Sequence, residues 1–510
     1  MIHLHFFYRI KVAEGTTMHL SFRRFLIGGW LLLPSASPSP ATEPCTLTVT
    51  SGPVAYQVFQ RCERNVADLS FEGTSDFHRP AIVQACVINM LTFLTVQDWQ
   101  PLGALTDGYW QGALKNVPAG GPYRIEIRLL DAEKNIRATA SIEHLLVGDL
   151  WILAGQSNMQ GAGELVDVEL PSLLVHSYGM NERWSIAAEP LHWLMDSIDP
   201  VHHPGLDGER LRRDGESQKK SAVAGAGCGL PFAKELVKTT GVPIGLIPCA
   251  HGGTSMTQWD PDKKNEAGHS LYGSMLRRFH AVGGKVKGLL WYQGESDANR
   301  GDAPQFHDRF SRFIEAVRRD FNAPELPVYF AQISRIVTKD AFPYWDDIRE
   351  QQRLCAAEIP HCGMVSTLDL PLDDPVHIST PGHKRLGKRF ARLVLQHVYG
   401  KTEWTHGPTL DYILPLPSRF KRYQVHFKGV NRKLVAVDRP SGFSLRDQNE
   451  SDLGLLYKTL ISSDGKSIDL FLYDQPPPGS CLWYGYGLDP YCNITDAEDM
   501  ALAAFGPIPL

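Results

Sequence analysis

Residues 147–159 read Val-Gly-Asp-Leu-Trp-Ile-Leu-Ala-Gly-Gln-Ser-Asn-Met, an apolar run that ends in a polar turn. The run, which begins at Leu145, is long enough for a strand that is buried on both faces of a sheet. Ser157 then lies where this strand passes into a helix, so its hydroxyl projects from the sheet edge as a nucleophile requires. The alternative interpretation is that Ser157 only caps the helix. The turn is not a Gly-x-Ser-x-Gly elbow, because Met159 occupies the position of the second glycine.

Apolar runs alternate with amphipathic segments from residue 145 to about residue 400. This alternation predicts an α/β fold, with a mostly parallel sheet that is covered by helices on both faces. Ligand sites in such a sheet lie at the carboxyl ends of its strands. The expected strands are 145–153, 243–247, 286–292, 328–333 and 364–368, and the expected helices are 230–239, 305–321, 345–357 and 382–397.

Short runs of alternating polar and apolar residues flank this part, as in residues 123–129 and 467–472. Such runs between turn signals are typical of β-sandwiches and other β-rich domains. The sequence therefore predicts four segments. They are a leader (1–41), an N-terminal β-sandwich-like domain (42–144), the α/β domain (145–400) and a C-terminal β-rich domain (401–510).

The leader has the pattern of a secretory signal peptide if translation begins at Met18. Arg23 and Arg24 precede the apolar run 25–33, and small residues and prolines follow it. This pattern predicts a secreted or periplasmic protein. The alternative is a disordered leader without a targeting role.

Composition excludes several classes of protein. The chain has 510 residues, of which 43% are hydrophobic and 21% charged, as in ordinary globular proteins. A net charge of −5 gives no basic footprint for nucleic acid, and no apolar run approaches the roughly 20 residues of a membrane span. The nine cysteines include no Cys-x-x-Cys pair, which disfavours zinc-knuckle and thioredoxin-like sites. The sequence alone does not decide whether Cys481 and Cys492 form a disulfide bridge.

Three further loops carry residues that suit chemistry at strand ends. Paired glycines at Gly252 and Gly253 let a backbone N–H approach a ligand, although a tight turn explains them equally well. The Gln293 side chain after the next strand is a candidate donor to an oxyanion, or else makes an ordinary loop hydrogen bond. Asp374 and His377, three residues apart, suit an orienting carboxylate and a general base. Asp373 and His383 are interpreted as structural.

In this order, the loops resemble those of the SGNH/GDSL hydrolase superfamily, and specifically of the sialate O-acetylesterase-like carbohydrate esterases. The resemblance covers roughly residues 145–400. It rests on the blocks GQSNM (155–159), GLPFAKEL (229–236), GLIPCAHGGTSMTQW (245–259), LLWYQGESD (289–297), DPVHIST (374–380) and GHKRLGKRFA (382–391). It implies an SGNH-type three-layer α/β/α domain, flanked by β-rich accessory domains.

The resemblance also implies roles for individual residues. Ser157 is the expected nucleophile, His377 the general base and later acid, and Asp374 the orienting carboxylate; neither a metal nor a cofactor is implied. The expected oxyanion donors are the N–H groups of Ser157 and of Gly252 or Gly253, together with the Gln293 side chain. Asn158, Trp259, Trp291 and Glu295 are candidate substrate contacts, although Glu295 is favoured as a residue that holds its loop through buried hydrogen bonds.

The expected activity is therefore removal of acetyl esters from sugar hydroxyls, with sialate esters as the first substrate class and acetylated xylan or another polysaccharide as the second. A non-catalytic carbohydrate-binding protein is the alternative of a different class, because residues 483–487 (Trp-Tyr-Gly-Tyr-Gly) suit sugar stacking. The segment 185–225 is expected to be an exposed insertion. A metal role for its His202 and His203 is disfavoured, because no carboxylate stands at a suitable spacing.

Overall fold

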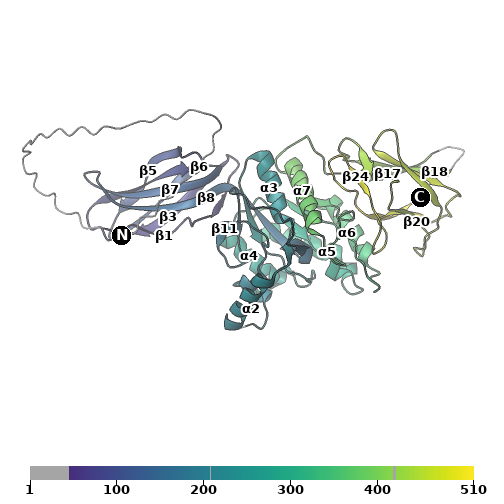
Figure 1. Cartoon of the computed structure of the whole chain (residues 1–510), viewed down its shortest axis with the longest axis horizontal. Coiled ribbons are helices and arrows are strands. Elements are labelled where there is room, and N and C mark those ends of the chain that lie inside the picture. The colour runs from purple at the N-terminus through teal and green to yellow at the C-terminus, as the bar shows by residue number, and fades with distance from the viewer. Residues whose placement is uncertain (1–44, 207, 417–420) are drawn as a thin grey trace, which may run out of the picture. The chain divides into compact units, whose positions relative to one another are not determined.

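The computed structural model describes residues 45–206, 208–416 and 421–510. The predicted leader (1–41), with its possible start at Met18, lies outside these ranges. Within them, no helix is both long enough and apolar enough to cross a membrane. The chain is α/β, with mixed sheets and additional β-rich regions (Figure 1).

The largest sheet positions the site. Along its main path the strand order is β11-β10-β13-β8-β14-β15-β16. Every pairing from β10 to β16 is parallel, while β11 pairs with β10 in the antiparallel sense. Antiparallel pairings of β7 with β8 and with β4 make the sheet as a whole mixed. The path consists of β8 (Ile136–Gly155), β10 (Val175–Tyr178), β11 (Trp184–Ile186), β13 (Ile244–Pro248), β14 (Gly288–Tyr292), β15 (Val328–Ala331) and β16 (Cys362–Val365).

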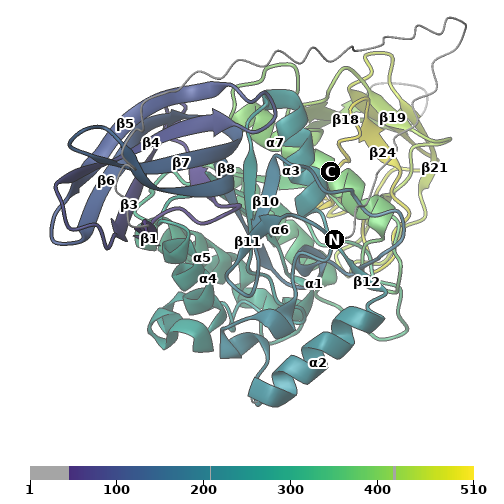
Figure 2. The same cartoon turned by 60° about the vertical axis from the view of Figure 1, so that its left-hand side comes forward.

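Four of the helices confirm sequence predictions to within a few residues. They are α3 (Gly229–Thr240), α5 (Phe306–Asp320), α6 (Trp345–Glu358) and α7 (Thr380–His397). The helix expected after Ser157 is the short α1 (Ser157–Gln160). The structure adds α2 (Gly208–Ser221) and α4 (Leu271–Ala281), which were not predicted. Helix α3 packs against α7 and α5 packs against α6, whereas α2 projects from the surface (Figure 2).

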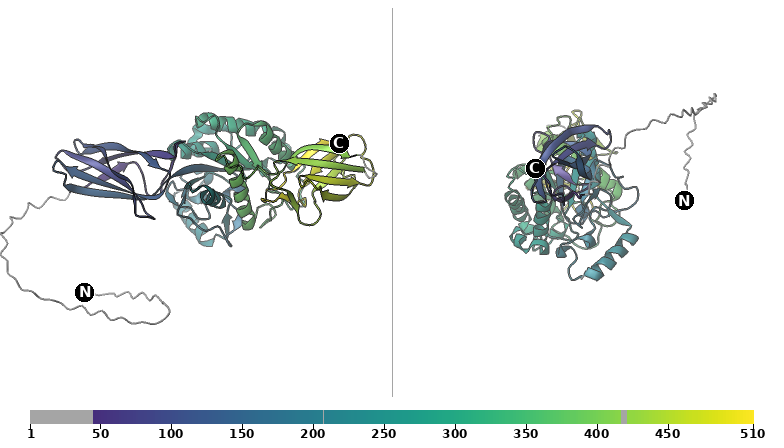
Figure 3. Two further views of the ribbon diagram at one scale, coloured as in Figure 1. Left: turned by 90° about the horizontal axis from the view of Figure 1, so that it is seen from above. Right: turned by 90° about the vertical axis from the view of Figure 1, so that its left-hand side faces the viewer.

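The N-terminal region is built of strands, shown in purple and blue in Figure 3. One sheet has the order β1-β3-β6, and β2, β4, β5 and β7 join the large sheet through β8. Buried side chains such as Phe71, Trp110 and Ile125 form one core. Strand β8 continues through the predicted boundary at residue 144 without a break. The bounds are β1 (Thr48–Ser51), β2 (Val58–Gln60), β3 (Val66–Thr74), β4 (Ala81–Asn89), β5 (Thr95–Leu105), β6 (Tyr109–Pro118) and β7 (Gly120–Asp131).

The C-terminal region holds three small sheets around a core of its own. Trp483 and Tyr484 are only 5% and 1% exposed, so these two rings are not available to stack on a sugar. All nine cysteines are free, and no bridge joins Cys481 to Cys492. The strands are β17 (Thr409–Leu416), β18 (Lys421–Lys428), β19 (Leu434–Ala436), β20 (Phe443–Arg446), β21 (Leu456–Ile461), β22 (Ser467–Leu472), β23 (Cys481–Tyr484), β24 (Ile494–Asp496) and β25 (Phe505–Pro509). Outside the C-terminal region, the short strands β9 (Gly163–Glu164) and β12 (Ala224–Ala226) pair with each other.

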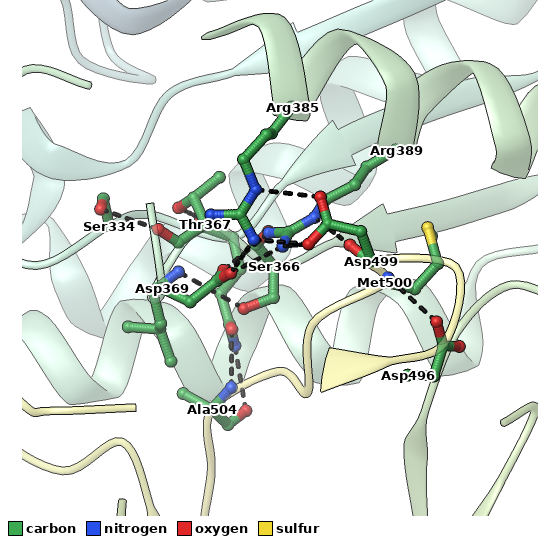
Figure 4. Close-up of polar contacts among 12 residues, drawn as sticks. Ser334, Ser366, Thr367, Asp369, Arg385, Arg389, Asp496, Asp499, Met500 and Ala504 are labelled. Carbon is green, nitrogen blue, oxygen red and sulfur yellow. Dashed lines mark hydrogen bonds and ion pairs between the residues drawn. The ribbon is translucent and has the colours of Figure 1, made fainter. Parts of the chain in front are cut away.

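An ionic cluster joins α7 to the loop between β24 and β25 (Figure 4). Arg389, which is fully buried, contacts both carboxylate oxygens of Asp369 at 2.7 Å and the carbonyl oxygen of Asp499 at 2.7 Å. Arg385, one helical turn earlier, also pairs with Asp369 and Asp499. Nearby, the Gln332 side chain makes two hydrogen bonds to the backbone of Ala504 (3.0 and 2.8 Å). The ion pairs of Asp369 with Arg385 and Arg389 fix the chain that precedes Asp374 to α7, the helix that follows His377.

Candidate active site

Ser157 lies at the carboxyl end of β8, as the first residue of α1. The turn before it needs glycine, because Gly155 has a φ of 131° and a Cβ there would lie 2.2 Å from the carbonyl oxygen of Tyr292. The N-cap position of α1 is Gln156, and its side chain makes no capping bond. The interpretation of Ser157 as a simple helix cap is therefore wrong. The N–H of Ser157 has no acceptor among the residues that the structure describes, as is usual in a first helical turn.

The Ser157 hydroxyl contacts a histidine that is distant in sequence. Its Oγ lies 2.9 Å from Nε2 of His377, and Nδ1 of the same ring lies 2.6 Å from Oδ2 of Asp374. Because a carboxylate only accepts hydrogen bonds, Nδ1 carries the ring proton and Nε2 is free to accept the serine proton. The structure thus brings together the three residues that the sequence singled out for this chemistry.

Asp374 is held as a carboxylate. Its Oδ1 accepts hydrogen bonds from the N–H groups of Val376 (2.9 Å) and His377 (2.7 Å). Partial burial acts to raise the pKa of Asp374, but these bonds and the one from the His377 ring outweigh it, so the pKa is lowered. The carboxylate therefore stays ionised and keeps the imidazole in one tautomer.

Asn158 and Glu295 lie beneath this chain of hydrogen bonds. The fully buried Asn158 donates to Oε1 of Glu295 (2.9 Å) and accepts from the N–H of Ile378 (3.0 Å). Burial raises the pKa of Glu295, against the opposing effect of the hydrogen bond from Asn158. With its polar atoms used by protein groups, Asn158 cannot reach a substrate in this conformation. Both residues instead link the Ser157, Glu295 and His377 loops.

The predicted oxyanion donors differ in their placement. A Cβ on Gly252 would lie 3.4 Å from Cβ of Ser157, so this glycine adjoins the nucleophile. Its N–H donates to Oε1 of Gln160 (2.8 Å), a residue that the sequence motifs did not indicate. Gly253 is exposed, with a φ of 70°. The Gln293 amide is fully buried and donates to Asp297 and to the carbonyl oxygen of Thr254 (3.0 Å), so its donors are already in use.

Trp259 and Trp291 lie in the core rather than at the surface of the site. Both are fully buried, and their ring centroids are 5.2 Å apart in an edge contact. Both rings also pack against Phe313, and Nε1 of Trp259 donates to Oγ1 of Thr254 (3.0 Å). Neither ring can contact a substrate in this conformation. Their place is to support the loops after β13 and β14.

The segment 185–225 is only partly an exposed insertion. Helix α2 is mostly exposed, but His202 and His203 are 4% and 8% exposed. His203 contacts the carbonyl oxygen of Ser197, whereas His202 contacts His251 and Ser274. Within the described ranges, no three His, Cys, Asp or Glu side chains are grouped so as to hold a metal ion.

Asp373 and His383, interpreted as structural, occupy structural positions. Oδ2 of Asp373 accepts from the N–H groups of Glu164 (2.8 Å) and Thr380 (3.1 Å), which ties the start of α7 to β9. His383 is buried in the first turns of α7, and burial lowers its pKa to about 3.

Comparison with known proteins assigns the chain to a family. Residues 147–396 match a family model described as "Carbohydrate esterase, sialic acid-specific acetylesterase". A protein named as a probable carbohydrate esterase from Arabidopsis thaliana is 30% identical over 271 residues, which cover 49% of this chain and 90% of that protein. Human sialate O-acetylesterase is 25% identical over 306 residues, which cover 51% of this chain and 54% of that protein.

The fold also has a counterpart among solved structures. The crystal structure of a carbohydrate acetylesterase from Xanthomonas citri matches 89% of this chain and 99% of that chain, with a TM-score of 0.59 and 20% sequence identity. At that identity the match shows a shared fold. The family assignment rests on the matched family model and on the Arabidopsis relative. The chain is an ester hydrolase that belongs to the carbohydrate esterase family of sialic acid-specific acetylesterases.

Proposed function

We propose that this chain removes acetyl groups from sugar hydroxyls by a serine mechanism, in an SGNH-type domain with a three-layer α/β/α arrangement. The observation that carries the proposal is the continuous hydrogen-bonded series from Ser157 through His377 to Asp374. Sialate esters are the first proposed substrate class, and acetylated xylan or another polysaccharide is the second.

In the first step, Oγ of Ser157 attacks the acetyl carbonyl carbon while its proton passes to Nε2 of His377. The tetrahedral intermediate then collapses, the bond between the carbonyl carbon and the sugar oxygen breaks, and His377 gives its proton to the departing sugar oxygen. Water attacks the acetyl-serine with His377 as base, and acetate leaves as the proton returns to Ser157. Asp374 stabilises the imidazolium and holds its orientation.

The N–H groups of Ser157 and Gly252 are the proposed oxyanion donors. The Gly252 N–H donates to Oε1 of Gln160, so its proposed role requires that the Gln160 side chain moves aside. Gln293 has no donor to spare, and we assign it to holding Thr254 and Asp297 behind the loop rather than to contacting the oxyanion. Such a hole is worth roughly 10²–10³ in kcat for each donor.

The test is acetate release from a panel of O-acetylated sialic acids, acetylated xylans, simple sugar acetates and an aryl acetate. Ser157→Ala is expected to lose at least about 10⁴-fold in kcat with an unchanged thermal unfolding profile. Labelling of Ser157 by a fluorophosphonate separates an activated serine from a non-catalytic carbohydrate-binding protein. An active Ser157→Ala variant would exclude the serine mechanism.

We further propose export, because of the signal-like pattern after Met18. Expression from Met18 in a secreting host, followed by N-terminal sequencing of the protein in the medium, tests this. Cleavage within or just after the small-residue stretch 35–41 is the expected result, and retention of the uncleaved chain in the cell would contradict it.

A further inference from the structure

A second series of hydrogen-bonded polar side chains runs from α4 to the loop that contains Gly252. It begins at Arg277 of α4, whose guanidinium contacts the two carboxylate oxygens of Asp199 at 2.8 and 2.6 Å. The Ser274 hydroxyl donates to Oδ2 of Asp199 (2.6 Å). Nε2 of His202 lies 3.3 Å from Oγ of Ser274, and Nδ1 of His202 lies 3.1 Å from Nδ1 of His251. The series ends at His251, the residue before Gly252.

The protonation of this series follows from its charged end. Burial acts to raise the pKa of Asp199, but the bonds from Arg277 and Ser274 outweigh it, so the pKa is lowered and Asp199 is a carboxylate. A carboxylate accepts only, so the single Ser274 proton points to Asp199. The Ser274 oxygen then accepts from His202, which places a proton on Nε2 of His202.

Both imidazoles are neutral at neutral pH. Burial, together with the nearby His251 and Arg278, lowers the pKa of His202 to about 3, and burial also lowers the pKa of His251. A neutral imidazole carries one N–H. With its proton on Nε2, His202 has a bare Nδ1 that accepts from Nδ1–H of His251. His251 is thereby left with a bare Nε2, which can only accept a hydrogen bond.

His251 lies next to the loop that holds the candidate nucleophile. The backbone N–H of His251 donates to the carbonyl oxygen of Gly155 (3.0 Å), two residues before Ser157. The next residue, Gly252, adjoins Ser157 directly. The His251 ring is half-buried, and Nε2 makes no hydrogen bond to any residue in the described ranges. A sugar whose acetyl group lies at Ser157 extends over such neighbouring residues and presents hydroxyl groups, which are donors.

We propose that Nε2 of His251 accepts a hydrogen bond from a hydroxyl group of the sugar that carries the scissile ester, and that His202, Ser274 and Asp199 are positioning residues that hold His251 in this tautomer. This proposal rests on the proposed function and names a specificity-determining contact for it. The partner is a sugar hydroxyl rather than a charged group, because a neutral acceptor nitrogen discriminates for a donor and carries no net charge.

Two substitutions separate the two nitrogens of His251. His251→Asn places its amide nitrogen near the position of Nδ1, which keeps a donor for His202 but removes the acceptor at Nε2. His251→Gln places an amide oxygen near the position of Nε2 and keeps the acceptor. The readout is the ratio of kcat/KM for a sugar acetate to kcat/KM for an aryl acetate whose leaving group has no hydroxyl.

The expected result is a fall of about tenfold in this ratio for His251→Asn and of less than about threefold for His251→Gln. His280→Asn, an exposed histidine on α4, is the matched control and is expected to leave the ratio unchanged. An unchanged ratio in His251→Asn, even where kcat/KM falls equally for both substrates, would overturn the proposal.

A measurement that does not depend on activity tests the tautomer. In protein with ¹⁵N-labelled histidine, a long-range ¹H–¹⁵N correlation spectrum is expected to show His251 protonated at Nδ1 and bare at Nε2. Ser274→Ala, which removes the acceptor for His202, is expected to mix the two tautomers. A proton on Nε2 of His251 in the wild-type protein would overturn the assignment. Failure of the wild-type protein to release acetate from any sugar would count against the proposed function, while the spectrum still decides the state of His251.

Discussion

Oδ1 of Asn158 accepts a hydrogen bond of 3.0 Å from the backbone N–H of Ile378. The residue after the candidate nucleophile thus holds the residue after the candidate base, although 220 positions separate them. The distance between Ser157 and His377 depends on this buried contact as much as on the two reacting side chains.

Asn158→Ala is therefore expected to lower kcat by roughly 10–100-fold and to destabilise the fold by about 1–3 kcal/mol, because it leaves the N–H of Ile378 and Oε1 of Glu295 without their partner. Acetate release and urea unfolding measure the two effects. The exposed Asn449→Ala serves as control and should change neither quantity. Full activity in Asn158→Ala would show that the loops keep their spacing without it.

Asp374→Asn is expected to lower kcat by about 10⁴-fold with little change in KM. An asparagine can present its amide nitrogen to Nδ1 of His377, which favours the tautomer with the proton on Nε2 and removes the acceptor for the serine proton. Steady-state kinetics with an aryl acetate measure this loss. A variant that retains more than about a tenth of the wild-type kcat would contradict the role of Asp374.

Gly252→Ala is expected to lower kcat by about 10–100-fold at a small cost in stability. The added Cβ would lie 3.2 Å from Oε1 of Gln160 and 3.4 Å from Cβ of Ser157, so it crowds the proposed oxyanion position. Gly253→Ala is the comparison, because open space surrounds it and its φ of 70° makes strain the main cost. Equal kinetic losses in both variants would indicate general distortion of the loop rather than crowding of the oxyanion position.

The buried Asp297 makes the stability of the fold depend on pH. Burial raises its pKa to about 6, against hydrogen bonds from Gln293 and the N–H of Met256, whereas the unfolded chain has a value near 3.9. The folded state therefore binds the proton more tightly, and its contribution to stability is fully present below about pH 4 and lost as pH rises to about 6. The loss is at most about 3 kcal/mol.

The measurement is the free energy of unfolding in urea at several pH values between 4 and 7, for the wild type and for Asp297→Asn. Other groups titrate in this range, so the difference between the two proteins carries the test. The free energy of unfolding of Asp297→Asn is expected to rise relative to that of the wild type as pH rises. A constant difference across this range would contradict the raised pKa of Asp297.

Arg389→Met is expected to cost about 3–5 kcal/mol of unfolding free energy, because it leaves the buried Asp369 carboxylate without its main partner. Arg385→Met should cost only about 1 kcal/mol, since its side chain is 36% exposed and water screens its ion pairs. Chemical unfolding of the two variants gives the comparison. Similar costs for both would show that burial does not decide the strength of this cluster.

Elements with a clear apolar period could be predicted from the sequence. Helix α5 repeats Phe306, Phe310 and Phe313 on one buried face. Helix α4 gives a weaker pattern, because polar residues such as Ser274 and Arg278 are buried beside its apolar residues. Helix α2 is polar on nearly every side, and its charged run indicated only an exposed segment.

Within the candidate site, Ser157, His377 and Asp374 could be predicted because each lies in a compact motif at a strand end. Gln160 and His251 could not, because their partners come from loops that meet only in the folded chain. For Trp259 and Trp291, the motif placed the residues near the site but did not indicate how far their side chains are buried. Both are fully buried.

Two sets of buried hydrogen bonds join the α/β part to the C-terminal strands. Gln332 bonds in both directions to the backbone of Ala504, and the buried Arg349 donates to the carbonyl oxygens of Gly485 (3.0 Å) and Gly487 (2.6 Å). A chain that ended at residue 400 would leave these buried donors and acceptors without partners, so it would be an unstable fragment rather than a smaller esterase. Exchange of the C-terminal strands between relatives would preserve the fold only where the incoming loops present the same carbonyl groups. In this chain the α/β part and the C-terminal strands thus satisfy each other's buried polar groups.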